Sequence, residues 1–201
     1  MNSYSHIRIG RMVLRQLQSE YHISLPSTVF LWANCRPDYS FKYKRIPHYK
    51  EPMNEIFAQL VNEISRCKWE KCELVFIADR LGIICHFLCD FFCYAHSPSF
   101  NGGITDHIRY ESKLNRFLKE HRNLCEQWID SDRLHQNQPK KGALLFLEGH
   151  YRDYLCQQTS VACDIQYSLE ACVRLTSRLL AQIQQNSAVP IRRSIHHAIS
   201  T

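Results

Sequence analysis

The sequence LVFIADRLGIICHFLCDFF, at residues 74–92, is apolar at nearly every position. A run of this kind predicts a helix over residues 72–95 that is buried on all of its faces and lies at the centre of the molecule. Two polar residues interrupt its second half, His86 and Asp90, which lie four residues apart and therefore share one face. Groups that can ionise are costly in such a helix unless they are paired or bind a ligand.

Apolar residues recur at helical spacing on both sides of this run, and more polar stretches separate them. Residues 21–50 contain several prolines, which predicts a long irregular segment between two helices. Residues 130–141 predict a polar connection, and residues 187–201 a flexible tail. Further helices are expected at residues 5–20, 53–64, 105–120, 124–129, 142–156 and 160–186. We therefore predict an all-α fold, a single-domain helical bundle over residues 1–201.

The composition fits one folded domain of 201 residues. Apolar residues make up 45% of the chain and charged residues 22%, which excludes wholesale disorder. No uninterrupted apolar run approaches the length of about 18 residues that a membrane-spanning helix needs. The net charge of +6 favours anionic partners, without choosing among phosphate esters, membrane surfaces and nucleic acid.

The chain is rich in cysteine and histidine, with 10 and 11 residues. No Cys-x-x-Cys pair occurs, so a cysteine zinc site or a redox motif is not expected. The first residues show no secretory signal, and we expect a cytoplasmic protein with reduced cysteines. Cys85, Cys89 and Cys93 recur in the buried helix as small apolar fillers. Any metal site must then be built from histidine and carboxylate side chains.

Histidines and acids recur at ligand spacing from the buried helix onward. His96 follows His86 and Asp90 at the expected helix end, and His107 and Glu111 are again four residues apart. Side chains at this spacing overlie each other on a helix and can reach one cation. Taken alone, the first pair is typical of a core hydrogen bond and the second of a surface ion pair. Two such pairs around a third histidine, on consecutive helices, favour metal binding.

The segment from Arg80 to His96 resembles the signature of the bacterial zinc-dependent phospholipase C family. That family shares its all-helical fold with the secreted single-strand-specific zinc nucleases. Further parts of the pattern occur in the expected order: His6 on an early helix, Pro37-Asp38 in the irregular segment, and His48 in a later loop. The resemblance therefore covers residues 6–111, and no motif is recognised after them.

The resemblance implies three zinc sites in one cleft. The first would be held by Asp38, His48, His86 and Asp90. The second would be held by His96, His107 and Glu111. The third would be held by His6 and Asp90, with Asp90 bridging it to the first. Two or three zinc ions are expected per chain, because the third site needs further ligands: the Met1 amine, a backbone carbonyl, the Ser3 or Ser5 hydroxyl, or water.

The activity that the resemblance implies is zinc-dependent hydrolysis of a phosphodiester. A metal ion suits this reaction because it lowers the pKa of bound water to about 7 and stabilises charge in the transition state. Asp38 is the candidate to orient or deprotonate the attacking water. We favour a phospholipase C that acts on phospholipid. The alternatives are a nuclease or nucleotidase of the same metal fold, and a metal-stabilised protein without turnover.

The segment from Tyr39 to Lys50 bears on the substrate, because it interleaves aromatic with basic residues beside two predicted ligands. Such a segment would seat aromatic rings at a membrane interface and basic groups on anionic headgroups. It would equally stack a base and contact phosphate in a nucleotide. A solvated loop with some rings packed inward is the third interpretation. We favour phospholipid at a membrane surface over nucleic acid, and we expect a membrane-peripheral protein with no stable protein partner.

Overall fold

The computed structural model describes residues 1–43, 45–71, 73–130 and 142–188, and this part of the chain folds into helices without strands. The predicted all-α fold is confirmed. Most of the predicted connection at 130–141 and of the predicted tail at 187–201 lies outside the described residues, and residues 187 and 188 continue the last helix. The elements are α1 (Ser3–Tyr21), α2 (Ser27–Ala33), the 3-10 helix η1 (Arg36–Asp38), α3 (Lys50–Ser65), α4 (Leu74–Phe91), the 3-10 helix η2 (Tyr94–His96), α5 (Ile104–Glu120), α6 (Arg122–Trp128), α8 (Ala143–Leu155) and α9 (Val161–Ala188).

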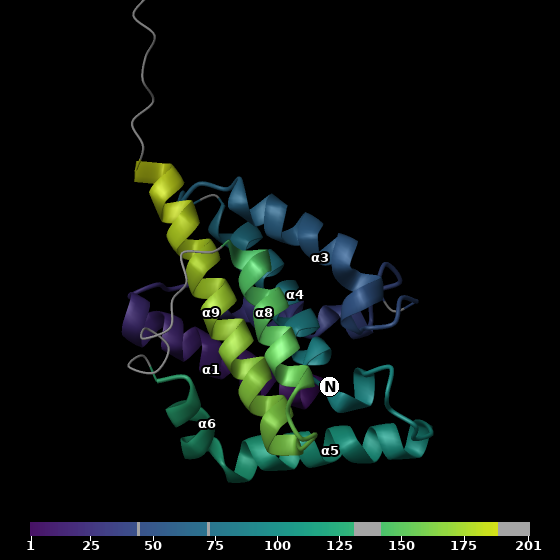
Figure 1. Cartoon of the computed structure of the whole chain (residues 1–201). Helices are drawn as coiled ribbons and strands as arrows, with labels where there is room; N and C mark the ends of the chain where they lie inside the picture. Colours follow the sequence, from purple (N-terminus) through teal and green to yellow (C-terminus); the bar gives the residue numbers. More distant parts are fainter. Residues whose placement is uncertain (44, 72, 131–141, 189–201) are drawn as a thin grey trace, which may run out of the picture.

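Helix α4 lies inside the bundle, as its apolar sequence predicts (Figure 1). It packs against α2, α3 and α9, and every residue from Leu81 to Cys93 is buried. Removal of this apolar surface from water is the dominant stabilising contribution to such a fold. His86 and Asp90, the two ionisable residues with nitrogen or oxygen side-chain atoms between Leu81 and Cys93, are both fully buried. The helix thus places two chemically active side chains in the interior.

Helix α2 and η1 occupy residues 27–38, where the sequence predicted part of one long irregular segment. That prediction is wrong for these residues, because a helix of 7 residues is too short to show a clear helical period. Helix α2 lies against α4 at Gly82, where a Cβ atom would come within 2.4 Å of the Phe30 carbonyl oxygen. Glycine at this position therefore permits the close approach that brings η1 onto α4.

Helix α9, with 28 residues, is the longest of the described helices. It packs against α1, α3, α4, α5, α6 and α8 and so connects the early helices with the late ones (Figure 1). None of the helices in the described part of the chain is long and apolar enough to cross a membrane.

His150, on α8, is buried among aromatic rings and links the stability of the fold to pH. Its ring centroid lies 5.1 Å from that of Phe92, and its Nε2 donates to the Tyr167 carbonyl oxygen at 3.1 Å. Burial lowers the pKa of His150 from 6.5 to about 4. As the pH falls through this range, the unfolded chain binds a proton that the folded chain does not, so stability decreases. By about pH 4 the decrease reaches about 3 kcal/mol.

We expect urea unfolding at a series of pH values to show this decrease in the parent chain and a smaller one in His150→Gln. Glutamine keeps a side-chain donor but does not titrate. Both chains retain the other histidines, so the difference between them isolates His150. The same pH dependence in both chains would contradict the assignment.

Candidate metal centre

Eight side chains that the sequence singles out converge where six segments of the chain meet. They are His6 on α1, Asp38 at the end of η1, His48 in the loop before α3, His86 and Asp90 on α4, His96 at the end of η2, and His107 and Glu111 on α5. Each has a nitrogen or oxygen atom within 3.8 Å of another member. The structure therefore brings together all of the residues predicted as ligands.

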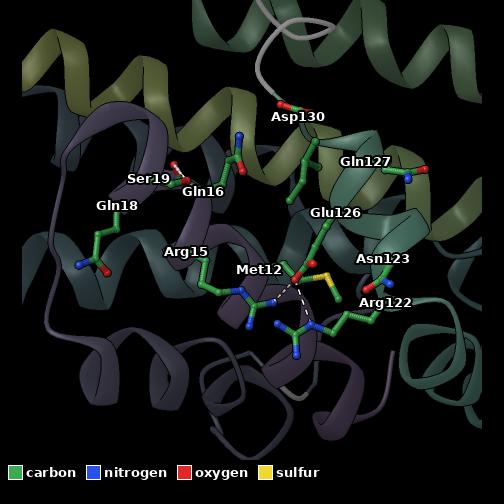
Figure 2. A pocket seen from close by; sticks show the side chains of 11 residues that line it. Met12, Arg15, Gln16, Gln18, Ser19, Arg122, Asn123, Glu126, Gln127 and Asp130 are labelled. Carbon is green, nitrogen blue, oxygen red and sulfur yellow. Dashed lines mark hydrogen bonds and ion pairs between the residues drawn. The ribbon is translucent and has the colours of Figure 1, made fainter.

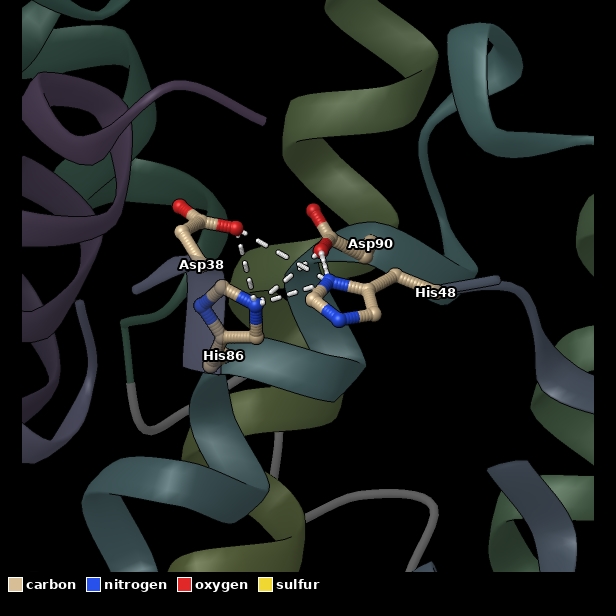
Figure 3. A group of neighbouring side chains, drawn as sticks. All are labelled: Asp38, His48, His86 and Asp90. Carbon is tan, nitrogen blue, oxygen red and sulfur yellow. Dashed lines mark hydrogen bonds and ion pairs between the residues drawn. The ribbon is translucent and has the colours of Figure 1, made fainter. Parts of the chain in front are cut away.

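Asp38, His48, His86 and Asp90 form the first of two groups (Figure 3). His48 Nδ1 and His86 Nε2 lie 3.2 Å from each other, and each lies 3.2 Å from Asp90 Oδ2. Asp38 Oδ1 lies 3.8 Å and 3.6 Å from the same two nitrogens. Ligand atoms around a tetrahedral zinc ion, with bonds of about 2.0–2.1 Å, lie roughly 3.3 Å apart. The observed spacing fits that ion.

Hydrogen bonds on the far side of each imidazole assign its tautomer. His86 donates from Nδ1 to the Asn34 carbonyl oxygen at 3.0 Å, and His48 donates from Nε2 to the Tyr43 carbonyl oxygen at 3.3 Å. The nitrogens that face each other therefore carry lone pairs, as do the carboxylate oxygens beside them. Four acceptors directed at one point repel one another unless a cation lies between them. The donor set thus fits a zinc ion independently of the spacing.

His96, His107 and Glu111 form the second group. Glu111 Oε1 lies 3.1 Å from His96 Nε2 and 3.0 Å from His107 Nε2. Burial alone would raise the pKa of Glu111, but the hydrogen bond from His96 and the neighbouring charges lower it to about 2. Glu111 is therefore ionised at neutral pH and available as an anionic ligand.

The Met1 amine and carbonyl lie beside His6, where the third zinc is predicted. The amine nitrogen contacts Asp90 Oδ1, and the carbonyl oxygen lies 3.0 Å from His6 Nε2. His6 Nδ1 is buried without a hydrogen-bond partner among the described residues. The Ser3 and Ser5 hydroxyls bond to other residues. Among the further ligands left open by the sequence, the amine and the carbonyl are the groups that face this position.

Asp90 connects the groups because its two carboxylate oxygens face different partners. Oδ2 faces the first group, whereas Oδ1 lies 3.5 Å from His6 Nε2 and 3.7 Å from His96 Nε2. Burial alone would raise the pKa of Asp90, but His96, the Met1 amine and His86 hold it well below its ordinary value. Asp90 is therefore an ionised residue shared by the neighbouring ligand positions.

A pocket of about 280 Å³ opens onto both groups and is lined by Asp38, Ile46, Pro47, His48 and His96. The side chain of Asp38 is 28% exposed, compared with 9% for His48 and 14% for His96. Among the predicted ligands that line the pocket, Asp38 is therefore the most accessible.

A separate hollow of about 670 Å³ lies between α1 and α6 (Figure 2). Arg15 and Arg122 both pair there with Glu126, at 2.8 Å and 3.0 Å. None of the predicted ligands lines it. The larger hollow is thus distinct from the place where the histidines and carboxylates gather.

The aromatic and basic residues from Tyr39 to Lys50 divide between surface and core. Tyr43 is buried, and Lys50 is buried with a carboxylate partner at 2.7 Å. Tyr39 and Phe41 are 62% and 84% exposed, while Lys44 lies outside the described residues. Only part of this segment is therefore accessible to a substrate, which agrees with a solvated loop that packs some rings inward.

Asn34, directly after α2, supports the centre and was not identified from the sequence. Its carbonyl oxygen accepts the hydrogen bond from His86, and its side-chain amide donates to the His6 carbonyl oxygen at 2.7 Å. Partners of this kind fix the orientation of metal-binding histidines. The first contact uses a backbone atom, and no pattern of residue types indicates such a role.

An apolar groove of about 590 Å³ lies beside the centre, between α1 and α2. Its lining includes Tyr39, which follows Asp38 directly, and Ser3, two residues after Met1. The Tyr39 and Ser3 hydroxyls hydrogen-bond at 2.8 Å, so the two segments that line the groove also border the metal centre. The other lining residues are Ile7, Arg11, Thr28, Leu31, Trp32 and Cys35. The sequence did not indicate this groove because it did not indicate α2.

The helical bundle and the eight converging side chains define a protein with a candidate centre for more than one metal ion. Residues 5–168 match the family model described as zinc dependent phospholipase C, and the chain belongs to this family. The resemblance carried by residues 80–96 is confirmed. The match also extends well beyond residue 111, into α8 and the first part of α9. No curated protein and no solved structure matches the chain.

Proposed function

We propose that the chain is a zinc-dependent phosphodiesterase that cleaves phospholipid as a phospholipase C. The observation that carries this proposal is the convergence of two ligand groups on Asp90, beside a pocket that Asp38 lines. Membership in a family of zinc-dependent phospholipases C supports the reaction class.

Zinc held by these residues would lower the pKa of bound water to about 7 and stabilise the charge that develops on a phosphodiester. We propose one ion on Asp38, His48, His86 and Asp90, and a second on His96, His107 and Glu111. A third would lie beside His6 and Asp90 and use the Met1 amine and carbonyl.

Asp38 is the residue that we propose as the base. Its Oδ1 faces the imidazoles of the first group, whereas its other oxygen points away from them (Figure 3). Burial raises the pKa of Asp38 above its ordinary value, although the nearby His86 opposes this effect. The oxygen that points away from the metal position can accept a hydrogen bond and then a proton from water, which suits a general base.

Two surfaces beside the pocket favour phospholipid as the substrate. Tyr39 and Phe41 follow Asp38 in the sequence and expose their rings. The adjacent groove is lined by apolar side chains such as Leu31 and Trp32, and its volume lies within the usual range of about 300–1,000 Å³ for ligand pockets. Exposed aromatic rings beside apolar surface are typical of proteins at a membrane interface. We propose that the groove accepts an acyl chain.

Substrate preference tests this proposal. Zinc-loaded protein is expected to release the phosphorylated headgroup from short-chain phosphatidylcholine and to leave a single-stranded oligonucleotide intact. Preference for the oligonucleotide would favour a nuclease. No turnover of either substrate at full zinc occupancy would favour a metal-stabilised protein without activity.

Trp32→Ala tests the groove. It is expected to raise KM for short-chain phosphatidylcholine about tenfold, because it removes roughly 1–2 kcal/mol of apolar contact. Hydrolysis of a phosphodiester without acyl chains should stay unchanged. Trp69→Ala makes the same change at a half-buried tryptophan outside the groove and is the control. An equal effect of Trp32→Ala on both substrates would contradict an acyl site here.

A further inference from the structure

Asp164 is a buried carboxylate in the first turn of α9, outside the groups described above. It accepts three hydrogen bonds. The Tyr154 hydroxyl donates to Oδ1 at 2.9 Å, and the Tyr110 hydroxyl and the Tyr94 backbone N–H each donate to Oδ2 at 2.8 Å. Burial of a carboxylate is costly unless its oxygens are paired in this way.

The three donors come from three different elements, and two of these carry ligands of the second group. Tyr94 is the first residue of η2, which ends at His96. Tyr110 lies on α5, directly before Glu111. Tyr154 lies on α8, which carries none of the predicted ligands.

No fully buried side chain holds the half of α5 that carries His107 and Glu111. None of residues 104–113 is buried, and Ile104 is 83% exposed. The first buried apolar side chain of this helix is Leu114. The position of the two ligands therefore depends on partly buried contacts, and Tyr110 is the hydrophobic residue of this half of α5 that packs against the core.

Tyr110 supplies such a contact. Its hydroxyl is held by Asp164, and its ring packs at an angle against that of Tyr94, with 5.7 Å between centroids. Burial and the nearby carboxylate raise the pKa of Tyr110 and of Tyr154, so both hydroxyls remain donors. Burial raises the pKa of Asp164 to about 6, so this residue is still mainly an anionic acceptor at neutral pH.

We infer that Asp164 is a positioning residue: through Tyr94 and Tyr110 it fixes His96 and Glu111 relative to each other, in the arrangement that binds the second metal ion. It touches neither the ligands nor the pocket. The inference rests on the metal role proposed for the second group. It also gives a role to Asp164 in the part of the family match after residue 111, where no sequence motif is recognised.

Two phenol variants test the inference as a matched pair. Tyr110→Phe and Tyr154→Phe each remove one hydrogen bond to the same carboxylate, at a similar cost to folding of about 1 kcal/mol. Tyr110→Phe is expected to weaken zinc binding at one of the sites about tenfold or more, whereas Tyr154→Phe should stay within about twofold of the parent. Competition with a chromophoric chelator measures both affinities.

Asp164→Ala is the stronger variant, because it removes the acceptor of all three hydrogen bonds and leaves the Tyr94 N–H and the Tyr110 hydroxyl without it. This variant is expected to bind zinc at least as weakly as Tyr110→Phe does. Its kcat should fall when zinc is limiting and recover in excess zinc, while KM stays unchanged. Thr176→Val, a buried change on α9 whose hydroxyl bonds only within that helix, controls for general destabilisation.

Equal zinc affinity in the two phenol variants would overturn the inference, and this comparison stands even if Asp164→Ala does not fold. A parent chain that binds no zinc would instead overturn the proposed function. The two failures are therefore distinguishable.

Discussion

Asp90→Asn is expected to lower kcat/KM for a phosphodiester by at least about a thousandfold. Asp90 is the residue whose two oxygens face different ligand positions, with Oδ2 on the first group and Oδ1 toward His6 and His96. An amide offers one acceptor oxygen and no charge, so it cannot serve both positions. A metal ion contributes several kcal/mol of charge stabilisation to the transition state, and each 1.4 kcal/mol is about tenfold in rate.

The measurement pairs zinc per chain, by elemental analysis, with kcat/KM on a water-soluble phosphodiester. Asp90→Asn should lose zinc as well as activity. Asp153→Asn makes the same change at an exposed position of α8 and should retain both. A folded Asp90→Asn chain with the parent's zinc content and activity would show that Asp90 is not a metal ligand.

The ligand pairs could be predicted because their geometry is local. His86 and Asp90, and likewise His107 and Glu111, are four residues apart on a helix, and this spacing alone places each pair on one face. The apolar run around the first pair identifies α4 as buried without any knowledge of its neighbours.

The contacts that hold the predicted metal ligands in place could not be predicted, because they join segments that are distant in the sequence. Helix α2 packs closely on α4, and Gly82 leaves the room that this approach needs. The Asn34 carbonyl that holds His86 is a backbone atom 52 residues away. Asp164 meets Tyr94 and Tyr110 across 70 and 54 residues. Residue types and spacing within one helix carry no information about such pairs.

Zinc removal is expected to lower the melting temperature by about 8–16 °C. A cation bound to these ligands would hold α1, η1, α4, η2 and α5 together, and binding to the folded chain alone stabilises it. At free zinc about a thousandfold above Kd, the stabilisation is about 4 kcal/mol. For a chain of this size, 1 kcal/mol shifts the melting temperature by about 2–4 °C.

Calorimetry with a chelator, and again after zinc is restored, measures the effect. Asp90→Asn is the control, because a chain that has already lost zinc should respond less to the chelator. The half of α5 that carries His107 and Glu111 has no buried side chain before Leu114, so its amides should lose protection from hydrogen exchange first. A zinc-free chain that melts at the parental temperature would mean that the helices alone hold the eight side chains together, and that the metal serves chemistry but not the fold.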